Sequence, residues 1–243
     1  GLPVGRAEAP ASPSRPARPE LVRPAEVPGA KASALPANAH LLHNLAHIEL
    51  NAVDLAWDTC VRFSGLLGMP AAFYEDFARV ADDEARHLGW CLQRLRELGH
   101  GYGDMPAHNL LWEGAQASAD SLGARMVVIP MVQEARGLDA GPRLVERLQG
   151  LQDERSAALV HQIAVEEKAH VAVGVFWFRF LCQAMGVADA GEEFRATALQ
   201  RCAGAVRGPF NEAARAEVGL PAEWYRGGAL AEMAEAMTAA AEE

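Results

Sequence analysis

Two short stretches decide the fold: Asp83–His87 reads DEARH and Glu166–His170 reads EEKAH, so each contains Glu-x-x-His. Residues three apart in a helix lie on the same face, and each pair therefore presents a carboxylate beside an imidazole. Apolar residues recur at helical spacing around both pairs, and Glu84 and Glu167 stand within the apolar stripe itself. Each stretch thus places ionisable groups where a helical protein would normally bury leucines.

Two other helical runs each carry one glutamate on the apolar face. Glu49 lies in a run over about residues 39–65, and Glu134 lies in a run over about residues 118–137. The order along the chain is Glu, Glu-x-x-His, Glu, Glu-x-x-His, and the two glutamates are 35 positions apart in the first half and 33 in the second. This repeat predicts two helical hairpins of similar size.

Four glutamates inside an apolar bundle need positive charge among them, because buried carboxylates are costly and repel one another. One Glu from each of two helices and Glu-x-x-His from each of the other two is the ligand set of ferritin-like dinuclear sites. Ligands rich in carboxylate and poor in nitrogen favour iron or manganese over zinc or copper. The alternative is that these groups form buried salt bridges or lie on solvated faces. We predict a site for two iron ions, or a manganese/iron pair, whose ligands are Glu49, Glu84, His87, Glu134, Glu167 and His170.

The whole chain has a helical character, and no strand pattern is evident. The main helices are expected over about residues 39–65, 70–98, 118–137 and 152–185, with a short helix near 107–117. Pro130 should kink the third main helix, and DAGP should begin a short helical connector after it. The predicted fold is all-α: a ferritin-like four-helix bundle over residues 39–243 with extra C-terminal packing helices.

Residues 1–38 differ from the rest in composition. They hold eight of the fourteen prolines and a net charge of +2, which leaves −12 on residues 39–243. So proline-rich a segment should be extended, either as a disordered tail or as a strap along the domain. The acidic remainder disfavours nucleic acid as a partner, since phosphate binding needs Lys/Arg clusters.

The cysteines and the apolar runs bear on location. The four cysteines are far apart in the sequence with no C-x-x-C pair, and Cys60, Cys91 and Cys182 fall in apolar helical runs, so we expect reduced core thiols. No apolar run reaches the ~18 residues of a membrane span, and the N-terminus lacks the apolar centre of a signal peptide. We predict a cytoplasmic protein with no membrane partner.

Six stretches carry a family resemblance: LLHNLAHIELNAVDLAWD, VADDEARH, LGHGYGDMPAHNLLWE, VIPMVQEARGLDAGP, EEKAHVAVGVFWF and GPFNEAARAEVGL. Over about residues 15–228 the chain resembles the DUF455 family of ferritin-like proteins. The resemblance implies a four-helix ferritin-like core with a dinuclear metal centre. The ligand pattern is also distantly similar to that of the non-haem di-iron hydroxylase that modifies an isopentenyl-type adenosine in tRNA, although many ferritin-like proteins share it.

DEARH is similar to the (Asp/Glu)-Glu-x-Arg-His form found in di-iron desaturases and monooxygenases. That similarity implies that Asp83 accepts a hydrogen bond from His170, and Glu166 one from His87, so that each acid orients a ligand. The second motif has Ala169 where the arginine would be, which weakens the link to desaturases. The alternative is that both acids are ordinary exposed helix residues.

A di-iron centre of this kind predicts an O2-dependent oxidoreductase of the hydroxylase or monooxygenase type, acting on a small organic substrate. Its electrons would come from a separate donor, because no flavin, nicotinamide or iron–sulfur motif occurs in the chain. The alternatives are a metal-stabilised binding or scaffold module without turnover, and a ferroxidase or iron-handling protein. A storage shell fits poorly with the long proline-rich arm, so a monomer or dimer is expected.

Overall fold

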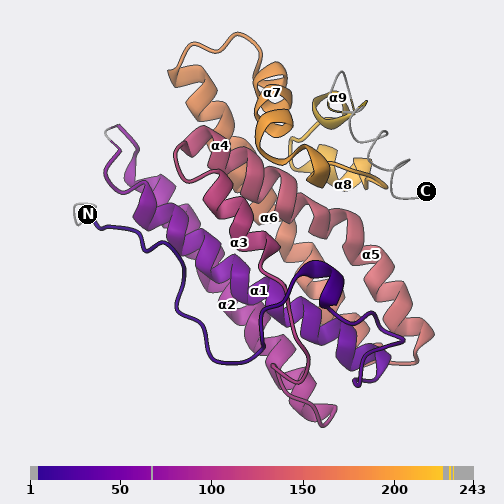
Figure 1. Ribbon diagram of the computed structural model, residues 1–243. Helices are drawn as coiled ribbons and strands as arrows, with labels where there is room; N and C mark the ends of the chain where they lie inside the picture. The colour runs from indigo at the N-terminus through magenta and orange to yellow at the C-terminus, as the bar shows by residue number, and fades with distance from the viewer. Residues whose placement is uncertain (1–4, 67, 227–229, 231, 233–243) are drawn as a thin grey trace. The chain divides into compact units, whose positions relative to one another are not determined.

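The computed structural model describes residues 5–66, 68–226, 230 and 232. Within these residues the chain is helical, and the extended pairing is limited to one isolated bridge between Leu21 and Ala107. The all-α prediction is confirmed. The helices, labelled in Figure 1, are α1 (Ala37–Arg62), α2 (Ala71–Glu97), α3 (Leu110–Ala117), α4 (Leu122–Met126), α5 (Ala135–Gly150), α6 (Glu154–Ala184), α7 (Ala190–Cys202), α8 (Glu212–Glu217) and α9 (Ala222–Tyr225).

The chain forms two compact units, and the boundaries between them fall within α3, α5 and α6. Unit 1 comprises the chain up to Glu113 together with Arg143–Ile163. Unit 2 comprises Gly114–Pro142 together with the chain from Ala164 onward.

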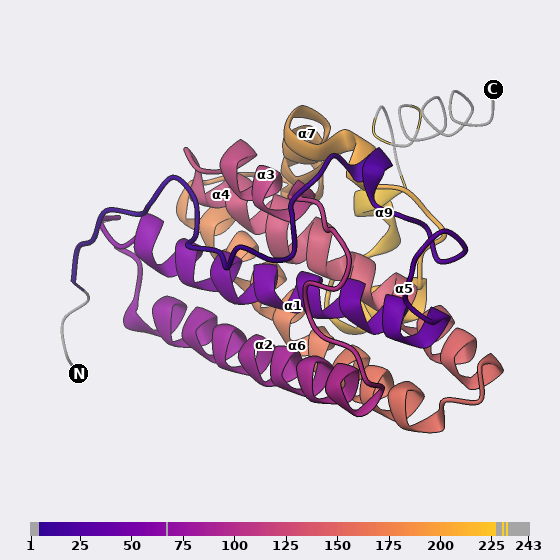
Figure 2. The same cartoon turned by 60° about the horizontal axis from the view of Figure 1, so that its bottom comes forward.

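Unit 1 is built on the hairpin of α1 and α2, which pack along their length (Figure 2). Each helix begins directly after a proline, Pro36 or Pro70, whose fixed φ suits the entry to a helix. The end of α5 and the start of α6 add apolar side chains to the same core, so four helical segments share it. Burying a leucine or valine in such a core stabilises the fold by about 1.5–3 kcal/mol. The core consists of Leu35, Ala39, Leu42, Ala46, Cys91, Leu95, Met105, Leu148, Ala157, Val160 and Ile163.

Residues 5–36 form a strap that lies along α1 (Figures 1 and 2). Arg15 donates from Nη2 to the Asn51 side-chain oxygen, at 2.9 Å. Val22 donates its N–H to the Ala107 carbonyl at 2.8 Å, and Ala107 donates back to the Glu20 carbonyl at 2.9 Å. The strap therefore forms hydrogen bonds with the rest of unit 1. Its many prolines lack backbone N–H groups, so the segment cannot form regular hydrogen bonds within itself.

Unit 2 contains a π-helical segment, η2 (Val127–Glu134), between α4 and α5. The predicted disturbance at Pro130 thus takes the form of wider turns, because a proline lacks the N–H that an α-helical ladder needs. Gly174 of α6 packs on this segment so closely that an added Cβ would lie 2.3 Å from the Pro130 Cβ. The absent side chain at Gly174 is therefore what lets α6 approach η2.

The predicted end of this helix near residue 137, followed by a separate connector, is wrong. α5 runs from Ala135 to Gly150 and includes both Gly141 and Pro142. Pro142 cannot donate to the Leu138 carbonyl four residues earlier, but Asn211 donates to that carbonyl from Nδ2 at 3.2 Å. An added Cβ at Gly141 would lie 2.8 Å from the Ala164 Cβ, so this glycine permits close packing and does not end the helix.

The C-terminal helices of unit 2 are fastened to α5 by one buried ion pair. Arg215 of α8 donates to both carboxylate oxygens of Asp139, at 2.9 and 2.6 Å, and both side chains are buried. The Arg215 guanidinium also lies 4.8 Å from the Phe210 ring centre and 4.6 Å from that of Tyr225. This pair holds the segment around α8 against the helix that directly follows Glu134.

The expected state of the cysteines agrees with the structure. Cys60, Cys91 and Cys182 are free and buried, and Cys202 is free and partly buried. None of the helices within the described ranges combines the length and the apolarity required to span a bilayer.

Candidate metal centre

Unit 1 holds the first half of the predicted ligand set. Glu49 comes from α1, and Glu84 and His87 come from α2. All three are buried: Glu49 is 2 % exposed, and Glu84 and His87 are 0 % exposed. The His87 Nδ1 lies 3.4 Å from Glu49 Oε2 and 3.4 Å from Glu84 Oε2. The α1–α2 hairpin thus brings two carboxylates to one imidazole nitrogen.

Unit 2 holds the second half, with the same composition. Glu134 is the last residue of the π-helical segment, while Glu167 and His170 lie one turn apart on α6. The His170 Nδ1 lies 3.5 Å from Glu167 Oε2. Glu167 and His170 are buried, and Glu134 is partly buried. The two halves therefore repeat one pattern of two glutamates and one histidine, as the order along the chain predicts.

The ligand atoms of these residues fall into two groups, each with all its atoms within 4.8 Å of one another. Such a buried Glu/His cluster could hold a metal ion, because oxygen and imidazole donors suit divalent iron or manganese and the buried carboxylates need positive charge. Each of the six residues predicted from the sequence belongs to at least one group. The first group is Glu49, Glu84, His87 and Glu167, and the second is Glu84, Glu134, Glu167 and His170.

Cys91 is a neighbour of this cluster that the sequence reasoning treated only as core. It lies one turn after His87 on α2 and is 0 % exposed. Burial raises the pKa of its thiol well above the ordinary value, and the nearby carboxylates of Glu49 and Glu84 raise it further. Cys91 therefore stays a neutral thiol beside the carboxylates. The sequence indicates this position of Cys91, because Cys91 lies four residues after His87 and therefore on the same face of the helix.

Asp83 and Glu166 stand beside the ligand residues in sequence, and neither belongs to the two groups. Asp83 is partly buried and pairs with Arg86, at 2.7 Å between Oδ1 and Nη2. Glu166 is also partly buried. Their expected hydrogen bonds to His170 and His87 stay predictions.

A second polar cluster in unit 1 joins α1 to the loop before α3. His47 contacts the Tyr102 hydroxyl through Nδ1 at 2.7 Å and the His108 carbonyl through Nε2 at 2.8 Å. His43 accepts from the Gly103 N–H through Nε2 at 2.9 Å. Burial lowers the pKa of His43 to about 4 and also lowers that of His47, so both imidazoles are neutral at pH 7. These histidines hold the loop in place and lie outside both Glu/His groups.

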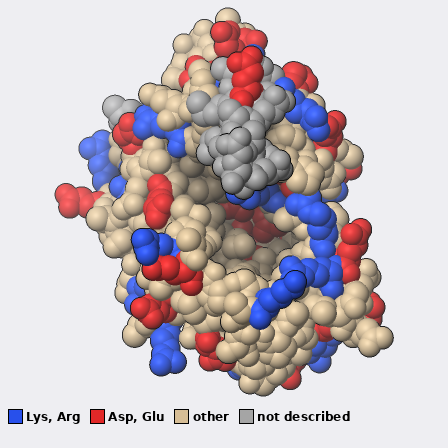
Figure 3. Space-filling model, turned by 45° about the vertical axis from the view of Figure 1, so that its right-hand side comes forward, with Lys and Arg blue, Asp and Glu red and all other residues tan. Residues whose placement is uncertain are grey.

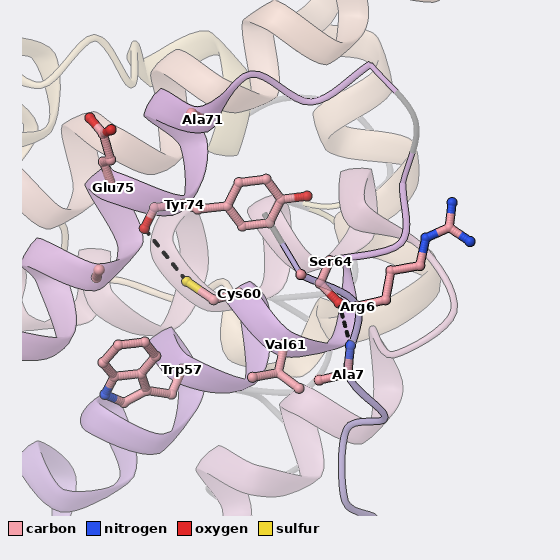
Figure 4. Close-up of a pocket in the computed structure, with 11 residues that line it drawn as sticks. Arg6, Ala7, Trp57, Cys60, Val61, Ser64, Ala71, Tyr74 and Glu75 are labelled. Carbon is pink, nitrogen blue, oxygen red and sulfur yellow. Dashed lines mark hydrogen bonds between the residues drawn. The ribbon is translucent and has the colours of Figure 1, made fainter. Parts of the chain in front are cut away.

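Unit 1 also contains a surface cleft of about 460 Å³, shown in Figure 4. Trp57 and Cys60 of α1 and Tyr74 of α2 line it, and the thiol of Cys60 donates to the Tyr74 carbonyl at 3.8 Å. Burial raises the pKa of Cys60 to about 11, so the thiol is uncharged at pH 7. Glu75 supplies the one carboxylate among the lining residues, and none of the six predicted ligands lies there. The cleft is therefore distinct from the Glu/His cluster.

Figure 3 shows acidic and basic side chains interspersed over much of the face in view. Surface ion pairs within the described residues include that of Arg201 with Asp120, at 2.9 Å. Exposed pairs of this kind contribute about 0–1 kcal/mol each to stability. They neutralise part of the basic surface locally, while the expected lack of nucleic-acid binding stays a prediction.

Comparison with known proteins places the chain in a family. No solved structure matches it significantly. A Haemophilus influenzae protein described as "Uncharacterized protein" is 39% identical over 176 residues, which is 71% of this chain and 61% of the relative, so this chain spans about three-fifths of that protein. The sequence profile "Protein of unknown function (DUF455)" matches residues 3–226, a range that contains both Glu-x-x-His motifs and both lone glutamates. The resemblance carried by those motifs is thereby confirmed, and the chain belongs to the DUF455 family.

Proposed function

We propose that the six Glu and His residues form a dinuclear iron centre in a ferritin-like four-helix bundle, and that the protein is an O2-dependent oxidoreductase. The observation that carries this proposal is the clustering of four buried or partly buried glutamates and two buried histidines. The repeat of Glu, Glu-x-x-His in each unit supports two metal positions rather than one. A manganese/iron pair would use the same ligands.

The two ligand groups suggest how the centre is assembled. Glu84 and Glu167 belong to both groups, so each of these carboxylates would be available to hold either of the two metal ions. Glu49 with His87, and Glu134 with His170, then complete one position each. If two irons were held and reduced at these residues, they would supply the electrons needed to activate O2.

The residues around the centre have supporting roles in the proposal. Asp83 and Glu166 accept hydrogen bonds from His170 and His87, which fixes the orientation of each imidazole. Cys91, uncharged beside Glu49 and Glu84, keeps this side of the cluster apolar. A small organic substrate, a separate electron donor and a cytoplasmic location belong to the same proposal.

Metal content tests the assignment directly. Purified protein is reconstituted with Fe(II) without oxygen, and bound iron is counted per chain. We expect two irons in the wild type, strong loss of both in Glu84→Ala, and loss of about one in Glu49→Ala. Glu75→Ala, which removes an exposed glutamate of α2, is the matched control and should retain both irons.

Oxygen reactivity then separates an enzyme from the other possibilities. On mixing with O2, the reduced wild type should give transient absorbance changes that Glu84→Ala lacks. Stoichiometric iron in every ligand variant would refute the metal centre itself. Bound iron that is inert to O2 would favour a metal-stabilised scaffold, and oxidation that deposits many irons per chain would favour iron handling.

A further inference from the structure

One aromatic side chain of unit 1 reaches from the buried Glu/His cluster to the surface of α2. Trp90 follows His87 by three positions on this helix, so the two side chains lie on the same side of it. The ring centres of His87 and Trp90 are 5.5 Å apart, and the ring planes are inclined by 36°. His87 is completely buried, whereas Trp90 is partly exposed. The indole therefore connects an imidazole of the predicted centre with the solvent-facing side of the helix.

Two charged neighbours on α2 hold the indole in this position. The Arg86 guanidinium lies 5.5 Å from the centre of the Trp90 ring. Arg86 is itself paired with Asp83, one turn earlier on the helix, at 2.7 Å between Nη2 and Oδ1. An arginine near an indole ring is a favourable cation–π pair, and the ion pair with Asp83 limits the movement of the guanidinium. The contact between the rings of Trp90 and His87 is thus maintained by neighbours on the same helix.

The helix surface beside Trp90 is accessible, whereas the predicted ligands of unit 1 are buried. Gly89 and Gln93, on either side of Trp90 along α2, are both exposed. Electron-transfer partners often contact each other over small areas, below about 1,200 Å² in total, so a donor needs to cover only a short length of helix. The proposed oxidoreductase needs electrons from such a separate donor. A partly exposed aromatic ring in contact with a ligand side chain joins the accessible surface to the buried centre.

We propose that Trp90 is the route by which electrons enter the metal centre, passing from the surface of α2 through the indole to the imidazole of His87. The inference rests on the dinuclear iron centre of the proposed function. In each transfer a one-electron reductant carried by the donor is oxidised and one ferric ion becomes ferrous, so two transfers reduce both ions. The indole acts as a tunnelling bridge: it forms no bond, takes up no proton and is not itself oxidised. Because its π electrons are delocalised over the ring, Trp90 couples the surface to His87 more strongly than an aliphatic side chain does.

A photochemical electron donor fixed beside Trp90 tests this route. The parent protein carries Gln93→Cys, to which a tris(bipyridine)ruthenium(II) complex is attached, and Cys202→Ser, which removes a partly buried native thiol. A light flash in the presence of ascorbate reduces the complex by one electron while ascorbate is oxidised. The reduced complex then passes that electron to a ferric ion of the iron-loaded protein, and the rate is followed by the absorbance of the complex.

Three variants of this parent separate the route through Trp90 from other effects. Trp90→Leu keeps an apolar side chain but removes the ring, and it should slow the transfer by about 10–100-fold, the range found for residues that contact a metal ligand. Trp90→Phe keeps a ring and should recover most of the rate. Trp57→Leu, at a 51% exposed tryptophan of α1, is the matched control and should react like the parent. Equal rates in Trp90→Leu and the parent would overturn the proposal, as would equal slowing by Trp57→Leu.

Iron content and a measurement without iron keep this result separate from the metal centre. Each Trp90 variant should bind two irons per chain, like the parent. Loss of iron in Trp90→Leu would mean that Trp90 only positions His87, which overturns the route but leaves the centre standing, whereas a parent that binds no iron refutes both. In the metal-free protein, the ring current of Trp90 should shift the NMR signals of the His87 imidazole. Trp90→Leu should remove that shift and Trp57→Leu should leave it, while an unshifted imidazole in the parent would contradict the ring contact.

Discussion

Replacing Gly174 with alanine tests whether the contact between α6 and the π-helical segment is as tight as the structure indicates. A Cβ at this position would lie 2.3 Å from Cβ and 2.4 Å from Cγ of Pro130. Ordinary carbon–carbon contacts are about 3.5–4.0 Å. A proline ring is closed onto its own backbone and cannot rotate away, so either α6 or η2 would have to move.

Two opposing effects set the size of the change. Alanine is favoured over glycine in a helix interior by about 1 kcal/mol. Overpacking a core costs about 1–3 kcal/mol, and a contact this short against a rigid ring belongs at the upper end. Gly174→Ala should therefore lower the free energy of unfolding by about 2 kcal/mol. In a chain of this size, that corresponds to a fall in Tm of about 4–8 °C.

The same variant should also disturb the metal centre. Pro130 lies four residues before Glu134, and Gly174 lies four residues after His170, so a shift at their contact is passed to both predicted ligands. Thermal unfolding and iron content are measured together on Gly174→Ala. We expect a lower Tm and less bound iron than in the wild type.

Gly89 of α2 provides the control, because an added Cβ there meets nothing within 4 Å. Gly89→Ala should stabilise the protein by about 0.5–1 kcal/mol through helix propensity alone. A Gly174→Ala variant that is as stable as the wild type and binds as much iron would refute the argument from close packing. Equal destabilisation by both variants would refute it as well.

Three further predictions concern contacts away from the cluster. Asp139→Ala leaves buried Arg215 without its carboxylate and should lower the free energy of unfolding by about 3–5 kcal/mol in urea titrations, whereas a loss under ~1 kcal/mol would contradict a buried pair. Burial is the largest single effect on Asp153 and would raise its pKa, but hydrogen bonds, led by those from Ser156, together lower the pKa to about 2. The ionised Asp153 should therefore contribute about 2 kcal/mol to the free energy of unfolding above pH ~4, and this contribution should be lost between about pH 4 and 2. Asp153→Asn should flatten that part of the stability profile, and an unchanged slope would show that other acids dominate. Arg15→Ala removes the hydrogen bond to Asn51 and the ion pair with Asp54, both on α1, and should speed limited proteolysis of the strap. Equal cleavage rates would show that the strap is held by its other contacts.

The helices were largely predictable because apolar periodicity is a local property of the chain. The predicted spans of about 39–65, 70–98 and 152–185 agree closely with α1, α2 and α6. Prediction failed after Glu134, where a glycine and a proline indicated a helix end. The helix continues there because Asn211, some seventy residues later, satisfies the carbonyl that Pro142 leaves without its helical donor. A contact between residues so far apart in the sequence cannot be predicted from local sequence patterns.

By itself, the sequence determined which side chains share a helical face, and so which carboxylates and imidazoles could act together. It also determined the family, through motifs distributed along most of the chain. Only the tertiary structure decided that the candidate ligand atoms fall into two groups, each with its atoms within 4.8 Å of one another. It also decided that Cys91 stands beside Glu49 and Glu84, and that Glu134 ends a π-helical segment. The physical reason is that helical period is set by backbone geometry within a few residues, whereas distances between helices depend on how distant side chains pack.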